Sequence, residues 1–278
     1  MTSAIGFRRA LALLAMLGAA APHLAAQALP SGGDSATLRL NASPRHGEWV
    51  KYDAGGGDSV RAWVSFPERR DRAPVVVVIH EIFGLSDWIR AVADQLAADG
   101  FIAVAPDLLS GKGPGGGGTE SVDQQGAVAL IRGLASDEVG RRLAAAAAYG
   151  TALPAARRAV ATVGYCWGGG VSFRAAGFMP DMRGAVVYYG TSPDSATLER
   201  VRTPVLGLYG GDDARVNTTI EPARAQLTRL GRRYETELFE GAGHGFLRDQ
   251  AGRAGANLAA AQRAWPRTVA FLRDVLGR

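Results

Sequence analysis

Hydrophobic and polar positions along this chain follow strand-like and helix-like spacings in turn. Residues 75–79 are continuously apolar and β-branched, which is typical of a central strand covered on both faces. Before them, residues 48–52 and 60–66 alternate apolar and polar side chains on either side of a glycine-rich turn. This pattern predicts a hairpin with one solvated face.

The remaining elements are predicted from the same two periods and from their end signals. Ser86 or Asp87 caps a helix that ends at Gly100, and Pro106 stops the strand that follows. Pro266 interrupts the last helix. The other predicted strands are 102–105, 159–163, 185–189, 205–208 and 234–239, and the other predicted helices are 127–134, 139–149, 220–230 and 258–276.

This alternation of strands and helices predicts the α/β class. We expect a single domain with a mostly parallel, doubly wound sheet, helices on both faces and an N-terminal antiparallel hairpin. Functional residues of such sheets gather at the carboxyl ends of the strands. A length of 278 residues suits one large domain of this kind.

The start of the chain has the features of a targeting segment. Arg8 and Arg9 precede an apolar stretch too short to span a membrane, and Ala26 and Ala28 offer cleavage sites. Residues 1–28 are therefore predicted to be a signal peptide, and the mature protein to be exported, periplasmic or secreted, without stable membrane insertion. The paired arginines leave the twin-arginine route open.

The net charge and its distribution limit the kinds of partner that we expect. Removal of residues 1–28 takes away two arginines and no acid, so the net charge falls from +5 to +3. No basic stripe interleaved with aromatic residues is present, so we expect no nucleic-acid partner. Residues 29–45 are polar and are predicted to be a flexible lead-in. We expect the protein to be a monomer.

The most informative motif is Gly-Tyr-Cys-Trp-Gly-Gly-Gly at residues 164–170. A strand leads into it and a helical stretch follows, as in a nucleophile elbow that carries cysteine in place of serine. Glycine is needed two residues before and after the nucleophile because that turn is crowded. Cys166, the only cysteine, would lie at a helix N-terminus, which favours the thiolate. The alternative is a small buried core cysteine.

A base and an orienting acid follow in the order expected of a hydrolase. Asp212 and Asp213 come after one strand, and His244 lies on a glycine-lined turn after the last strand. We expect one of the two carboxylates to orient His244 and the other to cap the segment after it. His46 lies in the polar lead-in, where solvation is expected.

The segment His-Glu-Ile-Phe-Gly at residues 80–84 follows the most apolar strand. A zinc motif fails because position 84 is glycine, and we expect neither a metal nor a cofactor. The loop after such a strand supplies an oxyanion donor, so the backbone N–H groups of Ile82 and Trp167 are the candidates. The carboxylate of Glu81 would raise the pKa of a nearby thiol or accept its proton.

The glycine-rich stretch 113–118 is a connector or a gate over the site. It is not a phosphate loop, because position 106 is proline where that motif needs glycine.

With these motifs in this order, the chain resembles the dienelactone hydrolase (carboxymethylenebutenolidase) family of α/β-hydrolases. The likeness runs from about residue 75 to 276, and the catalytic domain is expected at 46–278. It rests on residues 80–84, 106–108, 164–169, 210–213 and 243–246.

The resemblance implies a Cys-His-Asp triad of Cys166, His244 and Asp213. It also implies that Glu81 pairs with the resting thiol and helps to activate it. Two arginines of the family bind the substrate carboxylate; Arg248 matches one of them, and Lys112 stands near the place of the other.

The sequence thus predicts a hydrolase of small esters or lactones that forms an acyl-enzyme. Two alternatives remain: a thioesterase or peptidase-like hydrolase on the same scaffold, and a non-catalytic extracytoplasmic binding protein.

Overall fold

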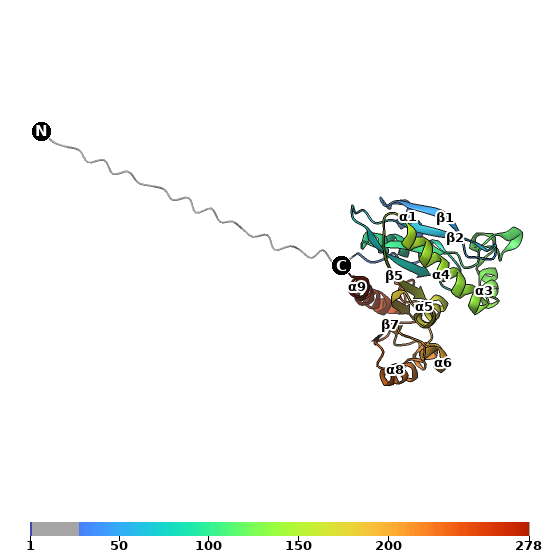
Figure 1. Cartoon of the computed structure of the whole chain (residues 1–278). Coiled ribbons are helices and arrows are strands. Elements are labelled where there is room, and N and C mark those ends of the chain that lie inside the picture. The colour runs from blue at the N-terminus through green and yellow to red at the C-terminus, as the bar shows by residue number, and fades with distance from the viewer. Residues whose placement is uncertain (2–27, 278) are drawn as a thin grey trace.

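One mostly parallel sheet organises the fold, with helices on both of its faces (Figure 1). The structure is a computed structural model that describes residue 1 and residues 28–277. The predicted signal peptide falls almost wholly on residues outside this part. No helix in the described ranges is long and apolar enough to cross a membrane.

The sheet of the described chain has eight strands in the order β1-β2-β4-β3-β5-β6-β7-β8. Only the pairs β1–β2 and β2–β4 are antiparallel; the other neighbours run parallel. The predicted fold class and the N-terminal hairpin are therefore confirmed. The strands are β1 (Gly47–Asp53), β2 (Ser59–Ser65), β3 (Ala73–Ile79), β4 (Ile102–Pro106), β5 (Ala156–Tyr165), β6 (Met182–Tyr188), β7 (Val205–Gly210) and β8 (Tyr234–Phe239).

The helices alternate with the parallel strands, as the sequence pattern predicts. They are α1 (Ala36–Asn41), α2 (Asp87–Ala98), α3 (Gln124–Arg132), α4 (Ser136–Ala152), α5 (Trp167–Phe178), α6 (Ser195–Leu198), α7 (Ala214–Asn217), α8 (Ile220–Arg229) and α9 (Ala256–Leu276). Short 3₁₀ turns lie at Pro114–Gly116, Thr119–Ser121 and Arg253–Gly255.

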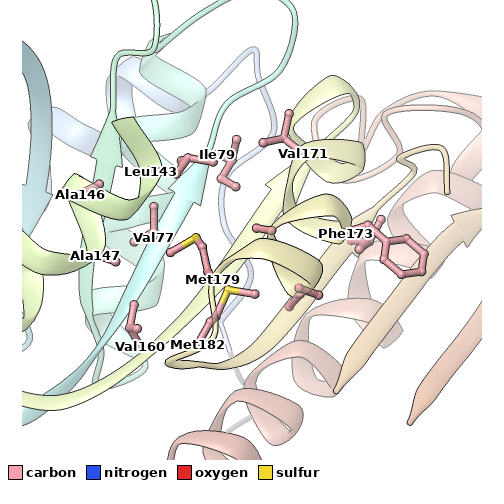
Figure 2. Close-up of a cluster of buried hydrophobic side chains, with 14 of the residues drawn as sticks. Val77, Ile79, Leu143, Ala146, Ala147, Val160, Val171, Phe173, Met179 and Met182 are labelled. Atoms are coloured by element: carbon pink, nitrogen blue, oxygen red, sulfur yellow. The ribbon is translucent and has the colours of Figure 1, made fainter. Parts of the chain in front are cut away.

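Strand β3 supplies side chains to two apolar layers, one on each face of the sheet. Val77 and Ile79 pack with Leu143 of α4 and Val171 of α5 in one layer (Figure 2). The alternate valines of β3 pack in the other layer, with α2 and α9. Successive side chains of a strand point to opposite faces, so a continuously apolar run serves both layers.

The segment before the hairpin, which is predicted to be a flexible lead-in, contains a short helix. Helix α1 forms there, with Ala36 buried against the layer beneath it. Ser43 Oγ donates to Asp94 Oδ1 at 2.5 Å, and the Arg45 guanidinium lies 2.6 Å from Asp94 Oδ2. The polar side chains of this segment thus bind a carboxylate of α2, a tertiary contact that local composition does not reveal.

The last helix is not interrupted at Pro266, contrary to the sequence prediction. Helix α9 runs unbroken from Ala256 to Leu276. Proline removes one helical hydrogen bond, to the carbonyl four residues earlier. Both Pro266 and Gln262 lie on the exposed side of α9, where water can solvate that carbonyl, while Trp265 and Val269 hold the helix on the core.

Candidate active site

Cys166 stands between the end of β5 and the first residue of α5, on a backbone turn with φ 56°. A positive φ is rare for a residue other than glycine and marks a strained, functional turn. A Cβ at Gly164 would lie 2.0 Å from the Gly168 carbonyl oxygen, and one at Gly168 would lie 2.3 Å from the His80 carbonyl oxygen. Only glycine allows this approach, so the crowding predicted for an elbow is present.

The surroundings of the thiol disfavour the thiolate at rest, contrary to the sequence prediction. Burial raises the pKa of the Cys166 thiol, and the nearby charge of Glu81 raises it further. The backbone N–H groups of Trp167 and Ile82 donate to the thiol and lower its pKa, but they do not offset burial. The helix N-terminus alone therefore does not produce a resting thiolate. These donors are the two amides predicted for the oxyanion.

Glu81 lies buried at the carboxyl end of β3 and pairs with Arg248. Arg248 Nε is 2.9 Å from Glu81 Oε2, an ion pair without the alignment of a good hydrogen bond. Burial raises the pKa of Glu81 to about 7 from its ordinary value of 4.5, although Arg248 acts in the opposite direction. The guanidinium also lies over the Phe83 ring, at 5.3 Å.

His80 holds the loop that carries Glu81 and Ile82, a role that sequence reasoning missed. Its Nδ1 lies 2.8 Å from the Glu81 carbonyl oxygen, and its Nε2 accepts from the Leu108 N–H at 3.2 Å. The second bond requires Nε2 to be unprotonated, so the ring is neutral and its Nδ1–H donates. Burial lowers the pKa of His80. The ring is stacked on Trp167 at 5.6 Å.

Asp213 and His244 come together from the loops after β7 and β8. His244 Nδ1 lies 2.5 Å from Asp213 Oδ2. A carboxylate accepts, so Nδ1 carries the proton and Nε2 is left as the basic nitrogen. Asp213 is buried and also caps α7, where its Oδ1 faces the Val216 N–H at 3.5 Å. It therefore takes both roles that the sequence divided between two carboxylates.

Asp212 does not cap the following helix, so that expectation is corrected. Its carboxylate lies 3.0 Å from Arg253 Nη1, and both side chains are about half exposed. Asn257 was missed by sequence reasoning. Its Oδ1 accepts from the Gly243 N–H at 2.9 Å, which fixes the turn that carries His244. A lone asparagine at a helix start gives no signal of this contact.

Tyr189 is a neighbour of Glu81 and Cys166 on one side and of His244 on the other. It follows β6 directly, has a φ of 41°, and is fully buried. Its ring stands edge-on to the His244 ring at 5.1 Å. Burial raises the pKa of Tyr189, and so do the nearby charges of Glu81 and Cys166. The sequence placed Tyr189 inside a strand, which hid its strained position.

The structure does not bring Lys112 to this cluster by any contact among the described residues. Its Nζ lies 2.7 Å from Glu138 Oε1, a carboxylate that also pairs with Arg142. Within residues 28–277, no group of three or more histidine, cysteine or acidic side chains is arranged to hold a metal ion.

Comparisons with known proteins show which chains and folds this protein is similar to. A model of the dienelactone hydrolase family matches residues 60–276. The protein named "Putative carboxymethylenebutenolidase" of Saccharolobus solfataricus is 29% identical over 264 residues, which cover 81% of this chain and 98% of that protein. The protein of the same name in Escherichia coli K12 is 27% identical, over 80% of this chain and 85% of its own length.

A solved structure gives the same result. The crystal structure titled "Putative Dienelactone Hydrolase" from Klebsiella pneumoniae superposes with a TM-score of 0.71 at 26% sequence identity. The match covers 81% of this chain and 97% of that chain.

Proposed function

Because the chain belongs to the dienelactone hydrolase family, we propose that it cleaves small esters or lactones with Cys166 as the nucleophile. The observation that carries the proposal is the His244–Asp213 bond, and an elbow thiol that faces two backbone N–H groups supports it. Tyr189 is a neighbour of both, because its ring contacts the His244 ring and the charge of Cys166 raises its pKa. The tautomer that this bond selects leaves His244 Nε2 free to take and return a proton.

The first half of the reaction forms an acyl-enzyme. The Cys166 sulfur attacks the carbonyl carbon while its proton passes to His244 Nε2. The carbonyl oxygen becomes an oxyanion, and the N–H groups of Ile82 and Trp167 stabilise it. The C–O bond then breaks, and His244 returns the proton to the leaving oxygen. In a lactone the leaving oxygen stays attached to the acyl group.

The second half regenerates the thiol. Water attacks the thioester carbonyl and gives its proton to His244 Nε2, and the carbon–sulfur bond breaks. The proton then returns from His244 to the departing sulfur, and the acid product leaves. Asp213 stabilises the charged imidazole in both halves.

In this proposal Glu81 acts on the thiol proton, and Arg248 contacts the substrate. Burial raises the pKa of Glu81 to about 7, so in the resting enzyme it can share the thiol proton, whereas the proton released in the attack passes to His244. The Arg248 side chain is 38% exposed, and its guanidinium is the proposed contact for an anionic substrate group. Lys112, whose ammonium is held by Glu138, takes no part in the proposal.

The nucleophile is tested with Cys166→Ala and p-nitrophenyl acetate. We expect the alanine variant to lose burst and turnover, and the wild type to gain the mass of one acetyl group in rapid-quench mass spectrometry. Wild-type turnover in the variant would refute the assignment. Phe178→Ala, on an exposed side chain at the end of α5, serves as a control that should keep the burst.

We also propose that residues 1–28 direct export and are removed. Mass spectrometry of the protein recovered from outside the cytoplasm should give an N-terminus after Ala26 or Ala28. Recovery of the intact chain in the cytoplasm alone would contradict export.

A further inference from the structure

The segment before α1 reaches across to the turn that carries Arg248. We call residues 29–33 the N-terminal strap. The Gly33 N–H donates to the Arg248 carbonyl at 2.8 Å, and the Gln250 side chain donates to the Pro30 carbonyl at 2.9 Å. Trp88 of α2 donates from Nε1 to the Ser31 carbonyl at 3.1 Å. Each bond is made by a different strap residue, so the strap is held along most of its length.

The strap also contacts the side chain of Arg248. A Cβ at Gly33 would lie 3.0 Å from Arg248 Cγ and 3.6 Å from Cδ, so the aliphatic stem lies directly on the Gly33 backbone. The guanidinium at the other end of the stem meets Glu81 at 2.9 Å and the Phe83 ring at 5.3 Å. Three surfaces thus confine one arginine, and the strap is one of them.

The segment after the strap ties it firmly to α2. Thr37 Oγ1 donates to Asp87 Oδ2 at 2.7 Å, and the Arg45 guanidinium binds the buried carboxylate of Asp94 at 2.6 Å. An arginine that must bind a ligand gains affinity when its rotamers are already restricted, because less conformational entropy is lost on binding. The anchored strap provides that restriction.

The strap lies outside the stretch that matches the family model, which begins at residue 60. We propose that the N-terminal strap is part of the substrate-binding site: the backbone at Gly33 positions Arg248 beside Glu81 and so sets the affinity for esters that carry an anionic group near the scissile carbonyl. This inference rests on the proposed function, in which Arg248 contacts that group. The strap does not touch the reacting atoms, so its residues are positioning residues.

The test compares Gly33→Val with the wild type on two substrates, p-nitrophenyl hemisuccinate and the neutral p-nitrophenyl butyrate. Gly33 has no left-handed φ, so its backbone accepts a side chain, and the added methyl groups displace the stem of Arg248. We expect the ratio of the anionic KM to the neutral KM to rise about tenfold, with kcat for the anionic ester changed less than about twofold. Gly33→Ala, which adds one methyl group, should shift the same ratio by a smaller factor.

Leu38→Ala is the control, since it removes an exposed side chain of α1 that takes no part in the argument. It should leave the ratio at the wild-type value. If Arg248→Ala raises the ratio of the anionic KM to the neutral KM but neither Gly33 variant changes it, the role of the strap is refuted. The role of Arg248 then stands. If Arg248→Ala does not discriminate either, the anion-binding role fails with the strap, while the Cys166→Ala experiment still decides the hydrolase itself.

Discussion

Replacing Glu81 with glutamine should change how the stability of the protein depends on pH. Burial favours the neutral acid, so the folded protein keeps this proton up to about pH 7, whereas the unfolded chain releases it near its ordinary value of 4.5. Between these values the folded state binds more protons than the unfolded state. The free energy of unfolding contributed by Glu81 therefore falls as the pH rises.

The size of the effect follows from the shift. A change from 4.5 to about 7 corresponds to about 3 kcal/mol at about 1.4 kcal/mol for each pKa unit. Roughly 2.5 kcal/mol of this falls between about pH 5 and pH 8, since the loss is only beginning at the lower value. Glutamine has the same shape and no titrating proton, so the variant should lack this slope.

Urea denaturation of the wild type and Glu81→Gln across that range measures the difference directly. Other titrating groups are shared by the two proteins and largely cancel. We expect the free energy of unfolding of the variant to rise relative to that of the wild type, by about 2 kcal/mol or more between about pH 5 and pH 8. Glu240→Gln, at an exposed carboxylate, should run parallel to the wild type. A constant difference between wild type and Glu81→Gln would show that Glu81 does not hold its proton in the folded protein.

Four further substitutions have defined outcomes. Asp213→Asn should lower kcat for p-nitrophenyl acetate about 10³-fold or more because it loses the imidazole orientation. Asp212→Asn, at an exposed carboxylate, should change kcat less than about twofold, and equal losses would contradict our assignment. Leu143→Ala should lower the free energy of unfolding in urea by about 3 kcal/mol, since the side chain is fully buried between α4 and the sheet; a loss below about 1 kcal/mol would refute this packing. Arg142→Met should cost about 3 kcal/mol in the same assay because it leaves Asp58 and the Leu108 carbonyl without their buried partner, and a neutral result would show that both are satisfied otherwise.

The sheet could be predicted from the sequence because its signals are local. A β-branched run such as β3, or the alternation along the β1–β2 hairpin, fixes both the element and the faces that it buries. Helix α1 could not be predicted in this way, because its side chains bond to Asp87 and Gln95 of α2, which are distant in the sequence. The interruption predicted at Pro266 was wrong for a related reason. The free-energy cost of a proline in a helix depends on whether the carbonyl that loses its hydrogen bond faces water.

The candidate site also has features that local sequence predicts and features that depend on the fold. The elbow glycines and the positions of Asp213 and His244 could be read from the sequence, because turns at strand ends need particular residues in a fixed order. The protonation of Cys166 could not, because helix N-terminus and burial act in opposite directions and only the fold shows which is stronger. The roles of His80 and Tyr189 were missed as well. The motif at residues 80–84 does not reveal the bonds that His80 makes across the loop, and Tyr189 lies in no motif.

The carboxylate of Asp213 has no spare oxygen. One oxygen accepts from His244, and the other faces the first turn of α7. A longer acid at this position would have to release one partner to keep the other, so even glutamate is a poor replacement. Random mutagenesis with selection for turnover should consequently leave position 213 invariant, while the exposed acid next to it accumulates many substitutions.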